Sequence, residues 1–229
     1  MNIDKSGILI ILPAYNEAQV IENVLLDLKN HGYSNICLVD DGSTDGTSQI
    51  AKSHQIKILK HPINLGAGAA IQTGINYARN QNFQFAILID SDGQHFPEDI
   101  ESLYDAMQKS EADIVIGNRF SNLENEIPTQ RLRYNRIANR LTNFFCDHTY
   151  SDTQSGFRLL NRRAIEKLNL KNSGFGFCSE MIIEGEKLNL KIVETPIRVL
   201  YTEYSLKKGQ DFREGVRTAR SIIWQVLFD

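Results

Sequence analysis

The chain has 229 residues and a net charge of −3, and its composition is 41% hydrophobic and 23% charged. These values are ordinary for a folded globular protein, and the near-neutral charge argues against a nucleic-acid-binding surface. Three cysteines lie far apart in the sequence, so neither a zinc site nor a disulfide framework is expected. No apolar stretch is long enough for a signal peptide core or a membrane span, which predicts a cytoplasmic protein.

Short apolar runs alternate with amphipathic segments over the first half of the chain. The apolar runs predict strands at residues 8–13, 36–41, 56–61, 85–90 and 112–119. The segments between them predict helices at residues 17–32, 46–55, 67–81 and 97–110. Strands that alternate with helices in this way form a mostly parallel sheet with helices on both faces, so we expect an α/β fold.

Arginine and aromatic residues become frequent in the second half. We expect a helix within residues 126–150, a short strand and a helix within 151–170, and a further helix and last strand within 174–205. Residues 1–210 are interpreted as one domain. Residues 211–229 are interpreted as an amphipathic C-terminal helix that could contact a membrane, pack on the domain or contact a second subunit.

Polar or glycine-rich segments follow the predicted strands. They are PAYNE (13–17), VDDGSTDGT (39–47), NLGAGAA (64–70), DSDGQH (90–95) and GNR (117–119). Ligands of such sheets bind beyond the carboxyl ends of the strands. These segments are therefore expected to form one site.

Asp90 and Asp92 end an apolar strand with no Lys or Arg nearby in the sequence. Two carboxylates this close repel each other unless a cation or a proton lies between them. Oxygen ligands suit Mg²⁺ or Mn²⁺, and such an ion completes its shell with water and substrate phosphate. We therefore predict a diphosphate held through a metal at this position. The alternative is a solvated turn.

Two other strand ends carry groups suited to a nucleoside and a sugar. Asp41 can hydrogen-bond a ribose hydroxyl or a base edge, although it could instead cap a helix. Glu17 could accept a hydrogen bond from a base or order a neighbouring loop. Alternatively, it could be no more than an acidic residue in the first turn of a helix. Gly66 and Gly68 would let a phosphate or sugar approach the N-terminus of a helix.

Together these motifs resemble those of family 2 glycosyltransferases, which have the nucleotide-diphospho-sugar-binding GT-A fold. The resemblance covers residues 8–210 and includes SGFR (155–158). DTQSGFRLL (152–160) and YTEYSLKKGQ (201–210) are most similar to polyprenyl-phosphate sugar transferases of the dolichol-phosphate mannosyltransferase type. The resemblance implies an inverting hexosyltransferase that uses Mg²⁺ or Mn²⁺, a UDP- or GDP-linked sugar donor and a polyprenyl phosphate acceptor.

The resemblance also implies roles for individual residues. Nucleotide-sugar binding is expected at Pro13, Tyr15, Glu17, Asp40, Asp41, Gly66, Gly68, Asp90 and Ser91. The metal is expected at Asp90, Asp92 and Gln94. Acceptor phosphate contacts are expected from Arg119, Arg131, Arg133, Ser155, Arg158, Ser205 and Lys207, where Arg131 and Arg133 are alternatives for one position. Catalytic roles are expected for Asp92, Arg119 and Glu180.

The sequence departs from the family pattern at two places. Glu180, in CSEM, stands where many relatives that glycosylate hydroxyl groups carry a Glu-Asp pair that supplies a general base. A hydroxyl must lose a proton as it attacks, whereas a phosphate monoester is already anionic, so the missing acid favours a phosphate acceptor. Tyr201 and Glu203 replace an Arg of close dolichol-type relatives, which leaves the donor sugar open.

Several alternatives stay open from the sequence. The acceptor could be a hydroxyl of a soluble glycan, and the chain could instead be a sugar nucleotidyltransferase that releases pyrophosphate. Arg158 could form a structural ion pair rather than contact a substrate. A membrane surface, approached from the cytoplasm, and a second copy of the chain are candidate partners.

Overall fold

The computed structural model describes residues 4–122 and 124–208. Within these residues one sheet has the strand order β3-β2-β1-β4-β6-β5-β7. The strands are β1 (Ile8–Ala14), β2 (Ile36–Asp40), β3 (Lys57–Lys60), β4 (Phe85–Leu88), β5 (Ile114–Asn118), β6 (Arg158–Asn161) and β7 (Ile192–Pro196). Every neighbouring pair is parallel except the two that involve β6. The predicted α/β fold with a mostly parallel sheet is confirmed.

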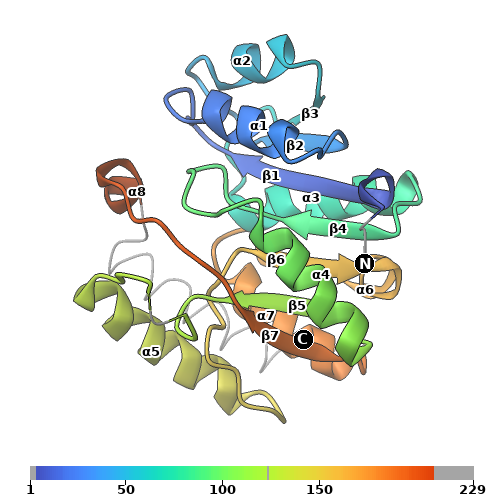
Figure 1. Cartoon of the computed structure of the whole chain (residues 1–229), viewed down its shortest axis with the longest axis vertical. Coiled ribbons are helices and arrows are strands. Elements are labelled where there is room, and N and C mark those ends of the chain that lie inside the picture. Colours follow the sequence, from blue (N-terminus) through green and yellow to red (C-terminus); the bar gives the residue numbers. More distant parts are fainter. Residues whose placement is uncertain (1–3, 123, 209–229) are drawn as a thin grey trace.

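Helices cover both faces of this sheet (Figure 1). They are α1 (Ile21–Asn30), α2 (Thr47–Ser53), α3 (Ala67–Asn80), α4 (Asp99–Ser110), α5 (Thr129–Phe144), α6 (Arg162–Lys167), α7 (Phe177–Lys187) and α8 (Glu203–Lys208), with a 3-10 turn η1 at Lys5–Gly7. In the ranges that the structure covers, no helix has the length and apolar character needed to cross a membrane.

The core is divided between the two faces by the period-two alternation of the strands. In β1, Leu9 and Ile11 pack towards α3, α6 and α7, whereas Ile8, Ile10 and Leu12 pack towards α1 and α4. All five side chains are at most 1% exposed. This explains why the strand reads as an unbroken apolar run rather than as an alternating one.

The direction of β6 determines what meets at the functional edge of the sheet. Because β6 runs antiparallel to β4 and β5, its first residue, Arg158, pairs with Leu88 and Ile116 near the ends of those strands. The loop that precedes β6 therefore arrives at the same edge as the segments that follow β4 and β5. In Figure 1, α5 and α8 lie on this side, towards which the β1 arrow points.

The observed elements differ from the predicted ones mainly at their ends. The first helix begins at Ile21 rather than at residue 17, because Asn16 has a positive φ of 55° and the Glu17 amide donates to Thr47 Oγ1 at 2.8 Å. Residues 203–208 form the short helix α8, which sequence analysis did not predict. The predicted C-terminal helix at 211–229, and with it the division at residue 210, lies outside the described residues.

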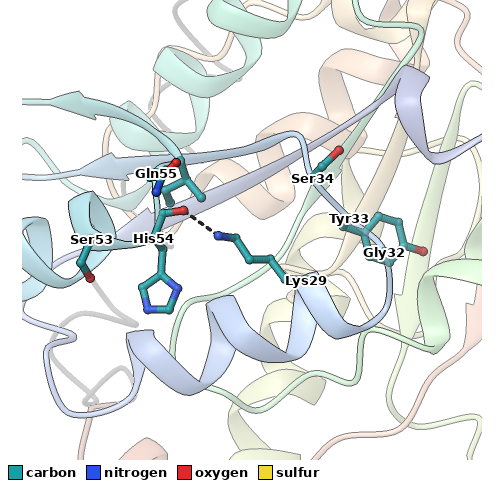
Figure 2. Close-up of a pocket in the computed structure, with 8 residues that line it drawn as sticks. Lys29, Gly32, Tyr33, Ser34, Ser53, His54 and Gln55 are labelled. Carbon is teal, nitrogen blue, oxygen red and sulfur yellow. Dashed lines mark hydrogen bonds between the residues drawn. The ribbon is translucent and has the colours of Figure 1, made fainter.

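An open pocket of about 510 Å³ lies at the amino-terminal edge of the sheet, next to the starts of β2 and β3 (Figure 2). Lys29 spans it and donates from Nζ to the carbonyl of His54 at 2.6 Å. No residue to which the sequence assigned a role lines this pocket. The strand ends that carry the predicted site residues lie at the opposite edge of the sheet.

Candidate active site

The Asp90–Gln94 turn follows β4 at the carboxyl edge of the sheet. Gly93 has a φ of 77°, and this left-handed conformation turns the chain back so that the Gln94 amide donates to Asp92 Oδ1 at 3.1 Å. The Gln94 side-chain amide also contacts Asp92 Oδ2. His95 Nε2 lies 3.4 Å from Asp90 Oδ2, and the Asp90 side chain is 44% exposed. The predicted metal ligands are thus brought together by one tight turn.

The two aspartates of this turn differ in their affinity for a proton. Desolvation raises the pKa of Asp92, and the nearby charge of Asp90 raises it further. Desolvation alone would also raise the pKa of Asp90, but contact with His95 and the positive charges of Arg119 and Arg158 hold it below its usual value. One carboxylate of the pair is therefore electrostatically disfavoured until a positive charge approaches.

These oxygens suit a divalent cation that takes most of its ligands from water and substrate. In the described part of the chain, no group of three or more His, Cys, Asp or Glu side chains could hold a metal ion by itself. Mg²⁺ typically uses one or two carboxylates and substrate phosphate, so Asp90 and Asp92 fit such an ion without a third protein carboxylate. The raised pKa of Asp92 points the same way, because a bound cation would offset both the burial of its charge and the repulsion from Asp90.

Gly156, in the loop before β6, forms part of the wall beside Asp90. A Cβ atom at Gly156 would lie 2.7 Å from both carboxylate oxygens of Asp90. The glycine therefore provides the space that the Asp90 side chain occupies. Sequence analysis assigned no role to it, although the SGFR motif contains it.

We expect Gly156→Ala to weaken Mn²⁺ binding by about tenfold, because displaced metal-site side chains typically cost tenfold to a hundredfold in affinity. The measurement is a Mn²⁺ titration that is monitored by calorimetry or by the shift in melting temperature. Gly7→Ala is the control, since a Cβ there meets nothing closer than 3.9 Å. Unchanged Mn²⁺ affinity in Gly156→Ala would show that Asp90 does not need its present position to bind the ion.

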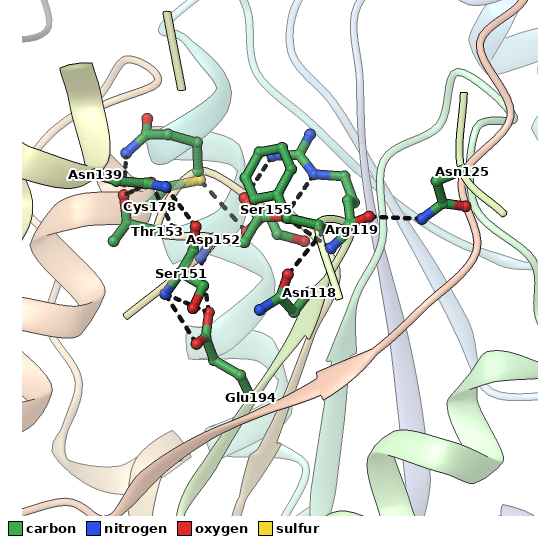
Figure 3. Close-up of polar contacts among 12 residues, drawn as sticks. Asn118, Arg119, Asn125, Asn139, Ser151, Asp152, Thr153, Ser155, Cys178 and Glu194 are labelled. Carbon is green, nitrogen blue, oxygen red and sulfur yellow. Dashed lines mark hydrogen bonds and ion pairs between the residues drawn. The ribbon is translucent and has the colours of Figure 1, made fainter. Parts of the chain in front are cut away.

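Arg119, directly after β5, forms a buried ion pair with Asp152 (Figure 3). Its Nε and Nη2 donate to Asp152 at 2.8 and 2.7 Å, and its backbone amide donates to the same carboxylate at 3.0 Å. Burial disfavours the charge of Arg119, but the pair with Asp152 raises its pKa above the usual value. Asp152 was missed as a functional residue by sequence analysis, although it opens the DTQSGFRLL motif.

Arg158 is fully buried and contacts the backbone. Its Nε donates to the Ser155 carbonyl and its Nη2 to the Thr153 carbonyl, both at 2.9 Å. Desolvation lowers the pKa of Arg158. The partners are backbone carbonyls rather than a carboxylate, so the alternative of a structural ion pair does not describe it.

Buried polar atoms without a partner gather at this edge. The described residues contain five such atoms: Tyr33 Oη, His95 Nδ1, Ser155 Oγ, Arg158 Nη1 and Tyr201 Oη. All but Tyr33 Oη belong to the surroundings of Asp90 and Arg119. His95 contacts Asp90, and the Tyr201 phenol lies close enough to influence Arg119. The charge of Arg158 lies close enough to both to interact with them, and the Ser155 carbonyl accepts from Arg158 Nε. Buried polar groups in folded proteins are normally hydrogen-bonded, so this cluster marks a place where a polar ligand would supply the missing partners.

Asp40, the last residue of β2, and Asp41, which follows it, bind different parts of the chain. Asp41 accepts from the amides of Leu65 and Gly66 at 2.9 and 2.7 Å and lies 2.7 Å from His61 Nδ1. Asp41 therefore holds the loop before α3, with His61 as a partner that sequence analysis did not identify. Asp40 is fully buried, and it accepts from the Ser43 amide at 2.8 Å and from the Ser48 hydroxyl.

The first loop lies beside these aspartates. Tyr15 is 45% exposed, so its ring is accessible at the carboxyl edge. The hydroxyl of Ser91 donates to the Pro13 carbonyl at 2.6 Å and joins this loop to the turn that carries Asp90.

Gly66 and Gly68 admit a neighbouring stretch of main chain. A Cβ at Gly68 would lie 2.0 Å from the Asn172 carbonyl oxygen, and one at Gly66 would lie 2.3 Å from that of Ser173. The same stretch is held by Glu180, whose carboxylate accepts from the amides of Lys171 and Asn172 at 2.7 and 2.9 Å. The small residues and Glu180 therefore act together on one loop at the N-terminus of α3.

The segment before and within α8 joins three parts of the site. The Leu200 amide donates to the Gln94 carbonyl at 2.9 Å, which connects the segment to the Asp90–Gln94 turn. Arg131 Nη2 donates to the Ser205 carbonyl at 3.3 Å, and its guanidinium lies 6.0 Å from the ring of Tyr201. Tyr204, which sequence analysis did not single out, donates to Glu17 Oε2 at 2.7 Å.

These contacts separate the two arginine candidates of α5. Arg131 faces the C-terminal segment, whereas Arg133 is exposed. The Ser205 hydroxyl donates to the Thr202 carbonyl at 3.1 Å, so it helps to shape the start of α8. The side chain of Lys207 lies outside the described residues, and its predicted phosphate contact stays a prediction.

Comparison with known proteins identifies relatives of this chain. A family model for glycosyl transferase family 2 matches residues 9–169. The chain is 32% identical to UDP-N-acetylglucosamine–dolichyl-phosphate N-acetylglucosaminyltransferase of Methanococcus voltae, with 92% of each chain covered. It is 27% identical to polyprenol monophosphomannose synthase of Mycolicibacterium smegmatis, with 91% of this chain and 83% of the relative covered.

Solved structures agree with the fold. Glucosyl-3-phosphoglycerate synthase from Mycobacterium tuberculosis, in complex with Mn²⁺, uridine diphosphate and phosphoglyceric acid, matches with a TM-score of 0.73 at 19% identity. The match covers 96% of this chain and 77% of that one. It confirms the predicted GT-A fold. The chain belongs to glycosyl transferase family 2.

Proposed function

We propose that this protein is an inverting, metal-dependent hexosyltransferase that moves a sugar from a nucleotide-diphospho-sugar to a polyprenyl phosphate at a membrane surface. The observation that carries the proposal is the cluster of unpartnered buried polar atoms on Ser155, Arg158 and Tyr201, next to Arg119 and the two aspartates. An anionic acceptor would bind such arginine and hydroxyl groups. The diphosphate of the donor would be held by a metal ion bound to the two aspartates.

The donor would bind at the carboxyl ends of β1, β2 and β4. Tyr15 and the loop that Asp41 holds would contact the nucleoside, as the resemblance to the family implies. A divalent ion held by Asp90 and Asp92, with Gln94 beside them, would offset the negative charge that develops on the leaving diphosphate. The structural neighbour solved with Mn²⁺ and uridine diphosphate supports a divalent ion and a nucleotide donor.

The acceptor would bind at the side of the site that contains Arg119 and Arg158. An acceptor phosphate oxygen would attack the anomeric carbon from the face opposite the diphosphate, so that one carbon–oxygen bond forms as the other breaks and the configuration inverts. Arg119 and Arg158 would hold the phosphate in line for this attack, which is a positioning effect. The relatives named for dolichyl-phosphate and polyprenol phosphate transfer support a lipid-linked phosphate as acceptor.

The surroundings of Glu180 also favour a phosphate over a hydroxyl acceptor. Glu180 is only 3% exposed, and its carboxylate accepts hydrogen bonds from two backbone amides. A carboxylate used in this way is poorly placed to remove a proton from a sugar hydroxyl. A phosphate acceptor needs no such base, because it is already anionic near neutral pH.

The test is an acceptor screen with the purified full chain, Mn²⁺ and a panel of UDP- and GDP-linked sugars. We expect transfer to a short polyprenyl phosphate to exceed transfer to oligosaccharides by at least about tenfold, which corresponds to about 1.4 kcal/mol of transition-state discrimination. Faster transfer to an oligosaccharide would instead identify a glycan-modifying enzyme. Release of pyrophosphate from a nucleoside triphosphate and a sugar phosphate would identify a nucleotidyltransferase.

A further inference from the structure

Helix α5 exposes an unusual combination of residues. Its sixteen residues include four arginines and no acid, and Thr142 is the only buried residue within this fully described helix. Two large apolar side chains point into solvent, since Ile137 is 65% and Phe144 is 80% exposed. Exposed apolar residues of this size are expected to be covered by a partner when they gather on one face.

The exposed residues do gather on one face. At 3.6 residues per turn, Arg133, Arg136, Ile137, Arg140 and Phe144 fall within an arc of about 100° around the helix. All five are exposed. We call this set the α5 stripe.

The opposite side of α5 is held against the domain. Thr142 Oγ1 lies 2.7 Å from Ser179 Oγ, and Asn139 Oδ1 accepts from the backbone amide and hydroxyl of Thr153 at 3.0 and 2.7 Å. Asn143, at the border of the α5 stripe beside Arg136, also donates to the Tyr150 carbonyl at 2.9 Å. These bonds fix the rotation of the helix, so the α5 stripe is directed away from the domain.

We propose that the α5 stripe docks onto the surface of an anionic lipid bilayer. Its arginines complement anionic headgroups, while Ile137 and Phe144 can enter the boundary of the acyl chains. A nucleic acid would use the arginines but offer little to the two apolar side chains. The whole chain carries a net charge of −3, so the attraction would be local to this face rather than a property of the entire surface.

Docking by this face would bring the arginine side of the active site to the membrane. Arg131, on the same helix, contacts the Ser205 carbonyl and lies beside Tyr201, which neighbours Arg119. The inference rests on the proposed function, because an enzyme needs to reach the membrane surface when its acceptor is a lipid-linked phosphate. It goes further by assigning the surface that meets the lipid.

The test is vesicle flotation with the full chain, in the absence of donor and acceptor. We expect binding to phosphatidylcholine vesicles that contain phosphatidylglycerol, weaker binding at high salt, and little binding to phosphatidylcholine alone. The double variants Arg136→Gln/Arg140→Gln and Ile137→Ser/Phe144→Ser are each expected to lower the partition coefficient by about tenfold.

Two matched controls lie on other helices. Lys52→Gln on α2 removes an exposed cation, and Leu26→Ser on α1 removes an apolar side chain that is 44% exposed. Both are expected to bind vesicles like the unchanged protein. The melting temperature of every variant is measured first, so that a folding defect is not read as lost binding.

Three outcomes would overturn the proposal. The unchanged protein could fail to bind anionic vesicles, the two α5 double variants could bind as well as the controls, or the α5 variants could lose a dimer while keeping vesicle binding. The last result would show that a second copy covers the α5 stripe. Transfer to a short, water-soluble polyprenyl phosphate without vesicles is measured in parallel, so a failure of docking and a failure of the proposed function can be told apart.

Discussion

Asp92→Asn is expected to abolish sugar transfer while leaving the fold intact. The substitution removes one of the two carboxylates placed to hold the metal, and a metal ion contributes several kcal/mol of charge stabilisation to such a transition state. A loss of about a thousandfold or more in kcat follows, since each 1.36 kcal/mol is tenfold. The measurement is turnover with a nucleotide-sugar and Mn²⁺, and removal of the metal by EDTA should have a similar effect on the unchanged protein.

The stability of Asp92→Asn supplies an independent check. Desolvation and the charge of Asp90 raise the pKa of Asp92, so its ionised form is disfavoured in the folded protein without metal. Replacing it with a neutral amide should leave the metal-free melting temperature unchanged or higher, and should remove the stabilisation by Mn²⁺. Asp105→Asn, at an exposed position of α4, is the control and should retain both activity and the Mn²⁺ effect. Near-normal turnover of Asp92→Asn would refute the metal assignment.

Asp152→Asn is expected to destabilise the protein and to weaken acceptor use. Asp152 is fully buried, and its two oxygens accept three hydrogen bonds from Arg119. Removing one partner of a buried ion pair typically costs about 3–5 kcal/mol, because the other charge stays buried and unpaired. For a chain of this size, a loss of about 3 kcal/mol lowers Tm by roughly 6–12 °C.

The kinetic effect of Asp152→Asn should be selective. Arg119 would lose its orientation, so the KM for the acceptor phosphate should rise by about tenfold or more, because a hydrogen bond to a charged group contributes about 1.5–3 kcal/mol. Donor affinity with Mn²⁺, measured by calorimetry below the lowered Tm, should change little. Asp113→Asn is the matched control, because it breaks the Asp113–Arg163 ion pair at the other end of β5. A drop in Tm without a change in acceptor KM would mean that Asp152 is structural only.

The strands and the acidic pair could be predicted because their signals are local. An apolar run such as 85–88 stops where polar residues begin, and the parallel α/β arrangement then places its end at a known edge. Helix ends were predicted less well. The first helix starts four residues later than its pattern indicates, because the Glu17 amide bonds to Thr47, thirty residues further along the chain.

Contacts between distant segments account for the residues that sequence analysis missed. Asp152 pairs with Arg119, which lies thirty-three positions earlier in the sequence. Tyr204 is hydrogen-bonded to Glu17, which lies near the other end of the chain. The glycines of NLGAGAA were read as space for a ligand, whereas the loop around Asn172 occupies the space next to them. Each of these contacts depends on which segments become neighbours in the folded chain. The local sequence around either residue does not indicate which segment that is.

The sequence by itself determined the fold class, the family and the turn that carries Asp90 and Asp92, because hydrophobic periodicity and short motifs are properties of consecutive residues. Only the tertiary structure decided how the second half of the site is built. The strand β6 inserts antiparallel between β4 and β5, and this reversal brings Gly156 against Asp90 and Arg158 near Arg119. Strand direction depends on pairing between residues that are 42 to 76 positions apart, which a local pattern cannot encode.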